Sequence, residues 1–212
     1  KFKKLTPVDE NSANPYTLTD DDRTVIGNTT PKFSGGFGLN ATFKGFDVSA
    51  FFNFMYDFDV FNANKVMMTT WASNNYNNFS MDISAAKRWR NFDDMGNEIR
   101  YSPEILAEFN KNATMWNPTS IGRPIAMSYA VEDGSFLRLN TATIGYTLPR
   151  AWTNKVGLSR VRFYASGYNL FTITGYSGYD PEVDIATGLT PNIDNNRYPR
   201  SRTYTFGVQL TF

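Results

Sequence analysis

The stretch KFSGGFGLNATFKGFDVSAFFNFMYDF, residues 32 to 58, decides the class of fold. One set of alternate positions in its first half is apolar: Phe33, Phe37, Leu39, Ala41 and Phe43. Lys44 and Gly45 interrupt the alternation, and it resumes over residues 46 to 58. A period of two is typical of strands whose two faces meet different surroundings. The sequence therefore predicts two antiparallel strands, at about 32 to 43 and 46 to 58, joined by a tight turn.

Three later segments alternate in the same way, at about residues 135 to 148, 160 to 173 and 201 to 212. In the first of them the apolar positions change parity near Thr141, which predicts a β-bulge or a change of facing surface. In the last, one face carries Tyr204, Phe206, Val208, Leu210 and Phe212. We therefore expect an all-β protein with five antiparallel strands.

Composition excludes several classes of function. The 212 residues include no Cys and no His, which excludes disulfides, thiol nucleophiles and catalytic centres that depend on histidine. The formal net charge of +1 gives no field that would attract a nucleic acid. The carboxylates at Asp180, Glu182 and Asp184 lie close together, but nothing in the sequence raises the pKa of one of them selectively. We expect these three to form a polar surface, and we expect no enzyme activity, cofactor or metal site.

The connections between the strands alternate in length. Residues 44 to 45 and 149 to 159 are short, whereas residues 59 to 134 and 174 to 200 are long. A soluble sandwich rarely contains a structureless loop of some seventy residues, whereas outer-membrane barrels have short periplasmic turns and long external loops. Each strand also reaches the ~9 to 11 residues that cross a bilayer. The pattern predicts a transmembrane β-barrel with external loops at 1 to 31, 59 to 134 and 174 to 200, an apolar face toward lipid and a polar face toward the lumen.

Five strands cannot close such a barrel, because natural membrane barrels begin at about eight. An open sheet edge in lipid would leave backbone groups unsatisfied, at several kcal/mol each. We therefore expect the remaining strands elsewhere, most simply in a preceding N-terminal part of the same polypeptide.

Four stretches resemble a known family: DRTVIGNTTPKFSGGFGLNATFKGFDVSAFF (22 to 52), DGSFLRLNTATIGYTLP (133 to 149), NLFTITGYSGYDPEV (169 to 183) and YPRSRTYTFGVQLTF (198 to 212). In this order they are similar to the C-terminal end of SusC-like (SusC/RagA) TonB-dependent outer-membrane transporters of Bacteroidetes. The resemblance implies a 22-stranded plugged barrel of which residues 1 to 212 supply the C-terminal five strands.

The resemblance also implies a function and partners. Such proteins import oligosaccharides or peptides across the outer membrane of Gram-negative Bacteroidetes, together with a SusD-like surface lipoprotein. The plug domain is absent from this chain, and TonB would be contacted through the missing N-terminal part. Membrane lipid and lipopolysaccharide would surround the barrel. Two alternatives share part of the pattern: a secreted all-β carbohydrate-binding module, and a passive porin-like barrel without plug or TonB.

Aromatic residues in the expected loops are the candidate contacts for substrate or partner. They are Trp71, Trp89, Trp116, Tyr176 and Tyr179. Sugars pack their C–H faces on aromatic rings, so these residues could bind a glycan. The alternative is that the tryptophan rings anchor the loop internally or pack on the lipoprotein, since Trp and Tyr are enriched at protein interfaces.

Short motifs in the loops give four further expectations. Family members often carry a calcium-like loop before the segment that starts at Asp22, but residues 20 to 22 lack the glycine and ligand spacing of such a loop, so we expect a solvated acidic turn. Ser102 before Pro103 predicts a short helix. Residues 81 to 92 are a second helix candidate, in which Arg88 and Arg90 are expected to be solvated or to pair with Asp93 and Asp94 rather than to bind an anionic substrate. Arg197, Arg200 and Arg202 are expected to pair with carboxylates or to reach lipopolysaccharide phosphate. The glycines in residues 33 to 38 are expected to permit curvature or close packing.

Overall fold

The structure of the protein is a computed structural model. It describes residues 3–8, 18–71, 78–120, 126–183 and 191–212.

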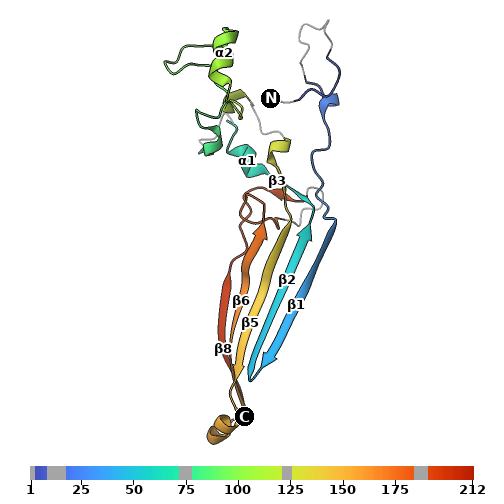
Figure 1. The fold of residues 1–212 in the computed structure, drawn as a ribbon, viewed down its shortest axis with the longest axis vertical. Helices are drawn as coiled ribbons and strands as arrows, with labels where there is room; N and C mark the ends of the chain where they lie inside the picture. The colour runs from blue at the N-terminus through green and yellow to red at the C-terminus, as the bar shows by residue number, and fades with distance from the viewer. Residues whose placement is uncertain (1–2, 9–17, 72–77, 121–125, 184–190) are drawn as a thin grey trace. The chain divides into compact units, whose positions relative to one another are not determined.

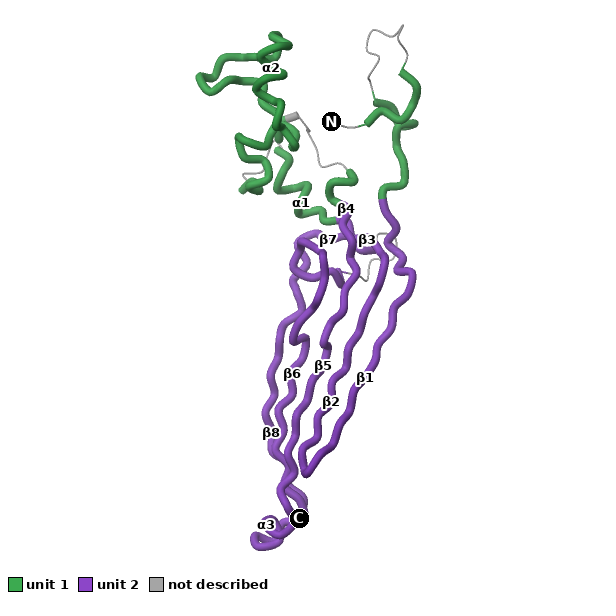
Figure 2. The backbone as a smooth tube through the Cα atoms, in the orientation of Figure 1, with its two compact units in different colours: residues 1–26, 62–130 green, residues 27–61, 131–212 purple. Residues whose placement is uncertain are grey.

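The chain forms two compact units, coloured separately in Figure 2. The first comprises residues 1–26 and 62–130, and the second comprises residues 27–61 and 131–212. None of the helices in the described ranges has the length and apolar character required to cross a membrane.

The second unit contains a five-stranded antiparallel sheet, drawn as long arrows in Figure 1. Its order is β1-β2-β5-β6-β8. The strands are β1 (Phe33–Phe43), β2 (Phe46–Tyr56), β5 (Phe136–Thr147), β6 (Arg160–Thr174) and β8 (Thr203–Thr211). Consecutive long strands are neighbours, so the sheet is a simple meander. The prediction of an all-β fold with five antiparallel strands is confirmed.

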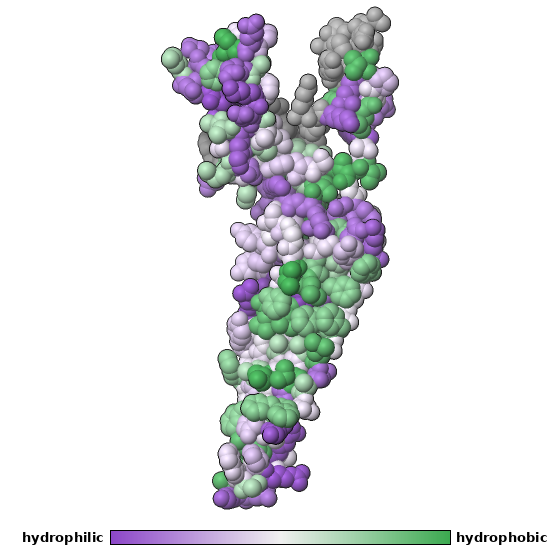
Figure 3. Space-filling model, viewed as in Figure 1, coloured by the Kyte–Doolittle hydropathy of each residue, from purple (hydrophilic) through white to green (hydrophobic). Residues whose placement is uncertain are grey.

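Cross-strand register places most of the apolar residues of the five long strands on one face. Phe37 pairs with Phe52, and their rings stack with centroids 4.9 Å apart. We call this surface the apolar face. The apolar face exposes many large side chains. They include Phe33, Phe37, Leu39, Phe43, Phe46, Val48, Tyr56, Ile144, Phe163, Phe171, Ile173, Tyr204, Phe206, Val208 and Leu210. Apolar side chains gather over the strands in the view of Figure 3. A sheet face that is exposed and apolar over this extent suits lipid rather than water.

A β-bulge in β5 keeps the apolar residues of this strand on one face. Leu139 pairs with Phe52 and Thr141 pairs with Phe51, so Asn140 is an extra residue. As a result Leu139 and Ala142, which differ in parity, both face the apolar side. The predicted bulge near Thr141 is confirmed.

The turn between β1 and β2 consists of Lys44 and Gly45. Both have positive φ angles, 46° and 88°. Two consecutive left-handed residues match the right-handed twist of the flanking strands, and glycine adopts this conformation without steric cost. The β5–β6 connection lies at the same end of the sheet (Figure 1) and contains α3 (Arg150–Thr153) and η5 (Asn154–Val156).

At the opposite end of the sheet a small second sheet joins the long strands. It has the order β4-β3-β7, with β3 (Asp59–Asn62), β4 (Val131–Asp133) and β7 (Ile193–Asp194). Beside it lies a core of buried side chains: Phe58, Val60, Phe136, Tyr176 and Val183. These strands lie within the expected loops at 59 to 134 and 174 to 200, and they are too short to show a period of two, so the sequence pattern does not predict them.

The first unit contains short helices joined by irregular segments. The helices are η1 (Asp20–Asp22), α1 (Ala63–Met67), η2 (Met81–Ile83), α2 (Pro103–Asn110), η3 (Pro118–Ser120) and η4 (Ser128–Ala130). The helix predicted after Ser102 is confirmed as α2. The helix predicted over residues 81 to 92 is wrong beyond η2. There the carbonyl oxygen of Lys87 accepts hydrogen bonds from the amides of Thr114 and Met115, which draws the backbone out of a helical path.

Candidate functional site

The face of the sheet opposite the apolar face is lined mainly by polar and small residues, and we call it the polar face. It includes Asn40, Thr42, Asp47, Ser49, Phe51, Asn53, Arg138, Thr143, Gly145, Arg162, Tyr164, Ser166, Thr172, Thr205, Gly207 and Gln209. In a closed barrel this face would line the interior. It is the surface that a polar solute would contact inside the barrel.

An ion pair crosses the polar face from β6 to β2. The Arg162 guanidinium donates to the Asp47 carboxylate, with Nε 2.9 Å from Oδ1, and Nη2 donates to Oδ2. The side chain passes over Gly145 of the intervening strand, where an added Cβ would collide with the guanidinium. This bidentate geometry fixes both side chains. The sequence pattern does not predict this pair. Its one local signal is Gly145 of β5, the small residue that pairs with Asp47 and lies beneath the Arg162 side chain.

Aromatic rings pack over glycines at two other places on this face. Tyr164 lies over Gly207 of β8, and Phe51 lies over Gly36 of β1. Between these rings, the hydroxyls of Thr143 and Ser166 are hydrogen-bonded at 2.8 Å. The expectation that the glycines of residues 33 to 38 permit close packing is confirmed at Gly36.

Buried charges close the polar face near the small sheet. Arg138 is only 1% exposed. Its guanidinium lies 2.5 Å from an Asp180 oxygen and 3.5 Å from a Glu182 oxygen. Glu182 also pairs with Arg200 at 2.6 Å, as expected for an arginine of the last loop. The expectation of a mere polar surface at 180 and 182 is wrong, because both carboxylates neutralise a buried arginine; Asp184 lies outside the described residues.

The residues following β6 are fastened to the same region. Tyr176 is 6% exposed, and its hydroxyl donates to Asp194 Oδ2 at 2.7 Å. Burial raises the pKa of Tyr176, and the hydrogen bond to Asp194 raises it further. The amide and hydroxyl of Ser177 donate to the Glu132 carboxylate, both at 2.9 Å. Tyr176 therefore belongs to the core, whereas the ring of Tyr179 is 86% exposed.

The three tryptophans belong to the first unit and differ in their surroundings. Trp116 donates its indole N–H to the Thr69 carbonyl at 2.9 Å, and its ring meets Tyr129 edge-on at 5.0 Å. Trp71 and Trp89 are partly exposed. Trp116 therefore anchors the loop, and Trp71 and Trp89 present part of their rings to the surroundings.

The acidic turn at residues 20 to 22 is more ordered than expected. Asp22, whose side chain is 4% exposed, accepts hydrogen bonds from the amides of Thr19, Thr6 and Leu5 and from the Thr6 hydroxyl, at 2.7 to 2.9 Å. Of these, the amides of Thr19 and Thr6 lower the pKa of Asp22 most. The expectation of a solvated turn is wrong for this residue. Within the described ranges, no group of three or more acidic side chains is placed to hold a metal ion.

Comparison with known proteins identifies relatives over most of the chain. No family model matches it. TonB-dependent receptor P3 of Formosa agariphila is 32% identical over 197 residues, which cover 90% of this chain and 17% of the relative. TonB-dependent receptor SusC of Bacteroides thetaiotaomicron is 32% identical over 164 residues, which cover 71% of this chain and 15% of SusC.

The fold also matches solved structures. The RagAB peptide importer in its closed-closed state superposes with a TM-score of 0.69 at 25% identity, covering 92% of this chain and 19% of the solved chain. This chain thus spans about a sixth of the length of the curated relatives it matches. The five-stranded sheet with its apolar and polar faces is a segment of a transmembrane β-barrel, and the chain belongs to the SusC-like TonB-dependent receptors of the outer membrane of Bacteroidetes.

Proposed function

We propose that the whole protein imports a nutrient oligomer across the outer membrane in a TonB-dependent manner. The two-faced sheet carries this proposal, because one face is apolar and exposed whereas the other holds the Asp47–Arg162 pair and a set of hydroxyls. This chain supplies the C-terminal part of the barrel wall, some of the lumen surface and loops that extend outside the cell at residues 1–31, 59–134 and 174–200. The other strands, the plug and the contact with TonB belong to parts of the protein outside these 212 residues.

The substrate we propose is an oligosaccharide, with a peptide as the second candidate. The partly exposed rings of Trp71 and Trp89 and the exposed ring of Tyr179 support a glycan, because such rings can pack against sugar C–H faces. The peptide alternative is supported by the solved relatives, which are named as peptide importers. Tyr176 and Trp116 would act indirectly, by holding the loops that carry the exposed rings.

We assign a SusD-like surface lipoprotein as the partner of the external loops. Several large apolar side chains of the first unit are exposed, among them Met81, Met95, Tyr101 and Ile105. Aromatic residues and methionine are enriched at protein interfaces, which supports a protein partner here.

The chain is proposed to have no catalytic role. The carboxylate pair that could have served a glycosidase, Asp180 and Glu182, is engaged with Arg138 and Arg200. Both carboxylates are therefore occupied by guanidinium groups, whereas a glycosidase needs two carboxyl groups that flank the scissile bond.

Uptake by whole cells tests this proposal. Cells that carry the gene, cells that lack it and cells without TonB would be supplied with fluorescent oligosaccharides and, separately, fluorescent peptides. We expect accumulation of one substrate class that requires both the gene and TonB. Accumulation that persists without TonB would instead support a passive porin-like barrel, and recovery of the protein in a soluble secreted fraction would support a carbohydrate-binding module.

A further inference from the structure

One end of the five-stranded sheet carries unbalanced positive charge. Residues 134 to 179 contain five basic residues and no Asp or Glu. Two of the five, Arg138 and Arg162, are neutralised by carboxylates from other segments. Of the rest, Arg160 begins β6, and Arg150 and Lys155 belong to the β5–β6 connection. Lys44, of the hairpin turn, joins Arg150 and Lys155 at the same end of the sheet. No carboxylate of the described residues forms an ion pair with these three, which we call the basic tip.

The basic tip also carries exposed apolar side chains. Trp152 of α3 is 61% exposed, and Val156 of η5, one turn further along the chain, is exposed as well. Phe43 and Phe46 flank the hairpin turn and are exposed as well. Tryptophan and lysine or arginine together are typical of the interface between lipid tails and headgroups. Charge and apolar surface therefore coincide at this end of the sheet.

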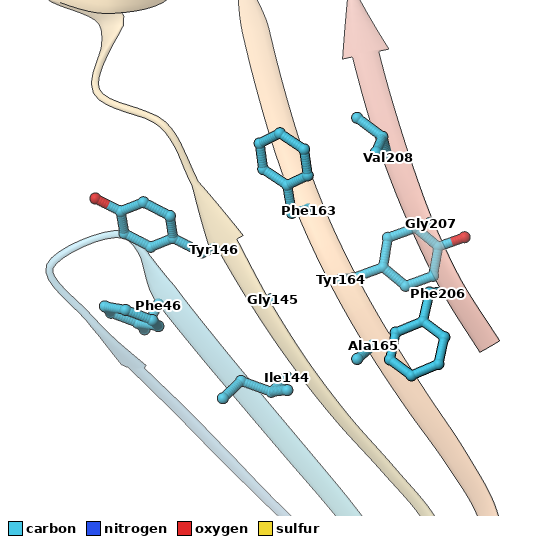
Figure 4. Close-up of a pocket in the computed structure, with 10 residues that line it drawn as sticks. All are labelled: Phe46, Ile144, Gly145, Tyr146, Phe163, Tyr164, Ala165, Phe206, Gly207 and Val208. Carbon is cyan, nitrogen blue, oxygen red and sulfur yellow. The ribbon is translucent and has the colours of Figure 1, made fainter. Parts of the chain in front are cut away.

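A groove on the apolar face begins next to the basic tip. Its volume is about 470 Å³, within the range of small-molecule sites. Its walls include Phe46, Ile144, Tyr146, Phe163, Phe206 and Val208 (Figure 4). The small side chain of Ala165 lies among these larger ones and leaves the space open. Phe46 is two residues from Lys44, and its ring packs on Tyr146 at 4.5 Å.

We propose that the groove and the basic tip together bind one anionic glycerophospholipid of the inner leaflet. An acyl chain would lie in the groove, and the headgroup phosphate would meet Lys44, Arg150 and Lys155. This inference rests on the membrane location of the family and on the proposed orientation, not on the identity of the transported substrate.

Position and charge select this occupant. The groove lies on the face that meets the bilayer, so its occupant is a bilayer molecule. The basic tip lies at the end with short connections, which is the periplasmic end in outer-membrane barrels, where the leaflet is formed by glycerophospholipids. Basic residues near a membrane surface each favour an anionic lipid by a measurable amount, and the basic tip presents three of them.

Native mass spectrometry of the full-length receptor in detergent tests the charge component. The receptor would be titrated with palmitoyl-oleoyl phosphatidylglycerol and with the phosphatidylcholine of the same chains. We expect preferential retention of phosphatidylglycerol. Reversal of two charges, Arg150→Glu with Lys155→Glu, should lower its retention about tenfold and leave phosphatidylcholine unchanged. The matched control is Arg100→Glu with Lys111→Glu, which reverses two charges in the first unit and should change neither.

A second pair of variants tests the groove. Ala165→Phe fills it and should lower retention of both lipids several-fold, whereas Ala142→Phe, on the same face but outside the groove lining, should not. Equal binding of the two lipids by the wild type, an unchanged response to charge reversal, or tighter retention of lipopolysaccharide would each overturn the proposal. If Ala165→Phe fails to assemble, the charge-reversed variant decides, because its substitutions lie outside the strands. Whole-cell uptake is measured in parallel, so failure of the transport proposal is distinguished from failure of this one.

Discussion

The five-stranded sheet and the loop segment at residues 62–130 distribute polar and apolar side chains in opposite ways. On the sheet, the aromatic and aliphatic residues of the apolar face are exposed, and among the most buried side chains is that of Arg138. In the loop segment the buried residues include Val66, Ile83 and Ile99, as in a protein that meets water. In both regions apolar side chains avoid water. On the sheet they do so by facing lipid, and in the loop segment they do so by being buried within the protein.

The two regions also differ in what holds them together. The sheet is held by continuous backbone ladders between neighbouring strands. The loop segment depends on a few side chains that bond to backbone, such as Asn110, which accepts from the Arg90 amide and donates to the carbonyls of Arg90 and Leu106. A single substitution in the loop can therefore release a segment, whereas the sheet is sensitive mainly to charge on the wrong face and to loss of its buried pairs.

The largest loss of stability is expected on substitution of Arg138, the buried charge of the sheet. Arg138→Met would leave Asp180 without its arginine partner and Glu182 with Arg200 alone. Removing one member of a buried ion pair costs about 3–5 kcal/mol. Thermal unfolding of the detergent-solubilised full-length receptor, followed by heat-modifiable migration, measures the loss. Arg202→Met, at an exposed arginine, is the control and should change stability by less than about 0.5 kcal/mol. Equal stabilities of the two variants would show that the cluster is not a structural tie.

An arginine introduced on one or the other face of β8 tests which face meets lipid and which meets the lumen. Phe206 is 79% exposed on the apolar face, and its neighbour Thr205 is on the polar face. Phe206→Arg is expected to lower the stability of the membrane-inserted barrel by up to about 2–4 kcal/mol, because an arginine near the bilayer midplane must be desolvated. Thr205→Arg, the same charge one residue away, should cost much less. Unfolding in phospholipid vesicles compares the two, and similar losses would contradict the assignment of the faces.

Tyr176 tests how the loop after β6 is fixed, with a smaller expected effect. Tyr176→Phe removes the donor to the buried Asp194 oxygen and should cost about 1–3 kcal/mol. Tyr179→Phe is the matched control, because that ring is exposed. The raised pKa of Tyr176 adds a pH dependence. Its stabilisation is complete below the pKa of tyrosine in the unfolded chain, about 10, and is lost as the pH rises above it. Thermal unfolding at about pH 8 and pH 11 measures this. The difference in stability between wild type and Tyr176→Phe should be smaller at pH 11 than at pH 8, and a difference that is the same at both pH values would count against this assignment.

The smallest global effect is expected at Asp22, which ties one short segment to another. Asp22→Ala should release the amides of Leu5 and Thr6, and hydrogen exchange followed by mass spectrometry should show faster exchange there, with Asp21→Ala unchanged. Because the pKa of Asp22 is lowered in the folded chain, its stabilisation is present above the ordinary carboxyl pKa of about 3.9 and is lost only as the pH falls through the lowered value. Protection in the wild type should therefore persist at about pH 4. Loss of protection already at pH 5 would contradict the hydrogen bonds assigned to this carboxylate.

The strands could be predicted because each is long enough to show a period of two. The alternation from Phe33 to Phe43 predicts a strand of the sheet, and the change of parity near Thr141 predicts the bulge. Ser102 and Pro103, which lie next to each other at the start of helix α2, predict this helix. Local signals within one element were sufficient in each of these cases.

What could not be predicted depends on partners far apart in sequence. Arg138 meets Asp180 across 42 positions, and Arg162 meets Asp47 across 115. Strands β3 and β7, of four and two residues, are too short to show a period. Residue type indicates the aromatic candidates, but it does not distinguish Tyr176 in the core from exposed Tyr179. Burial at these sites follows from the topology, which the sequence pattern left open.

The bulge at Asn140 acts like a shift of reading frame within one strand. Ahead of it, odd-numbered residues such as Leu137 and Leu139 meet lipid, and after it even-numbered residues such as Ala142 and Ile144 do. Deleting Asn140 would transpose one half of β5, so that either its leucines or its second half would turn inward. Insertions and deletions in β5 should therefore be tolerated only in compensating pairs. Among relatives, the position of this extra residue is expected to be kept even where the residue itself changes.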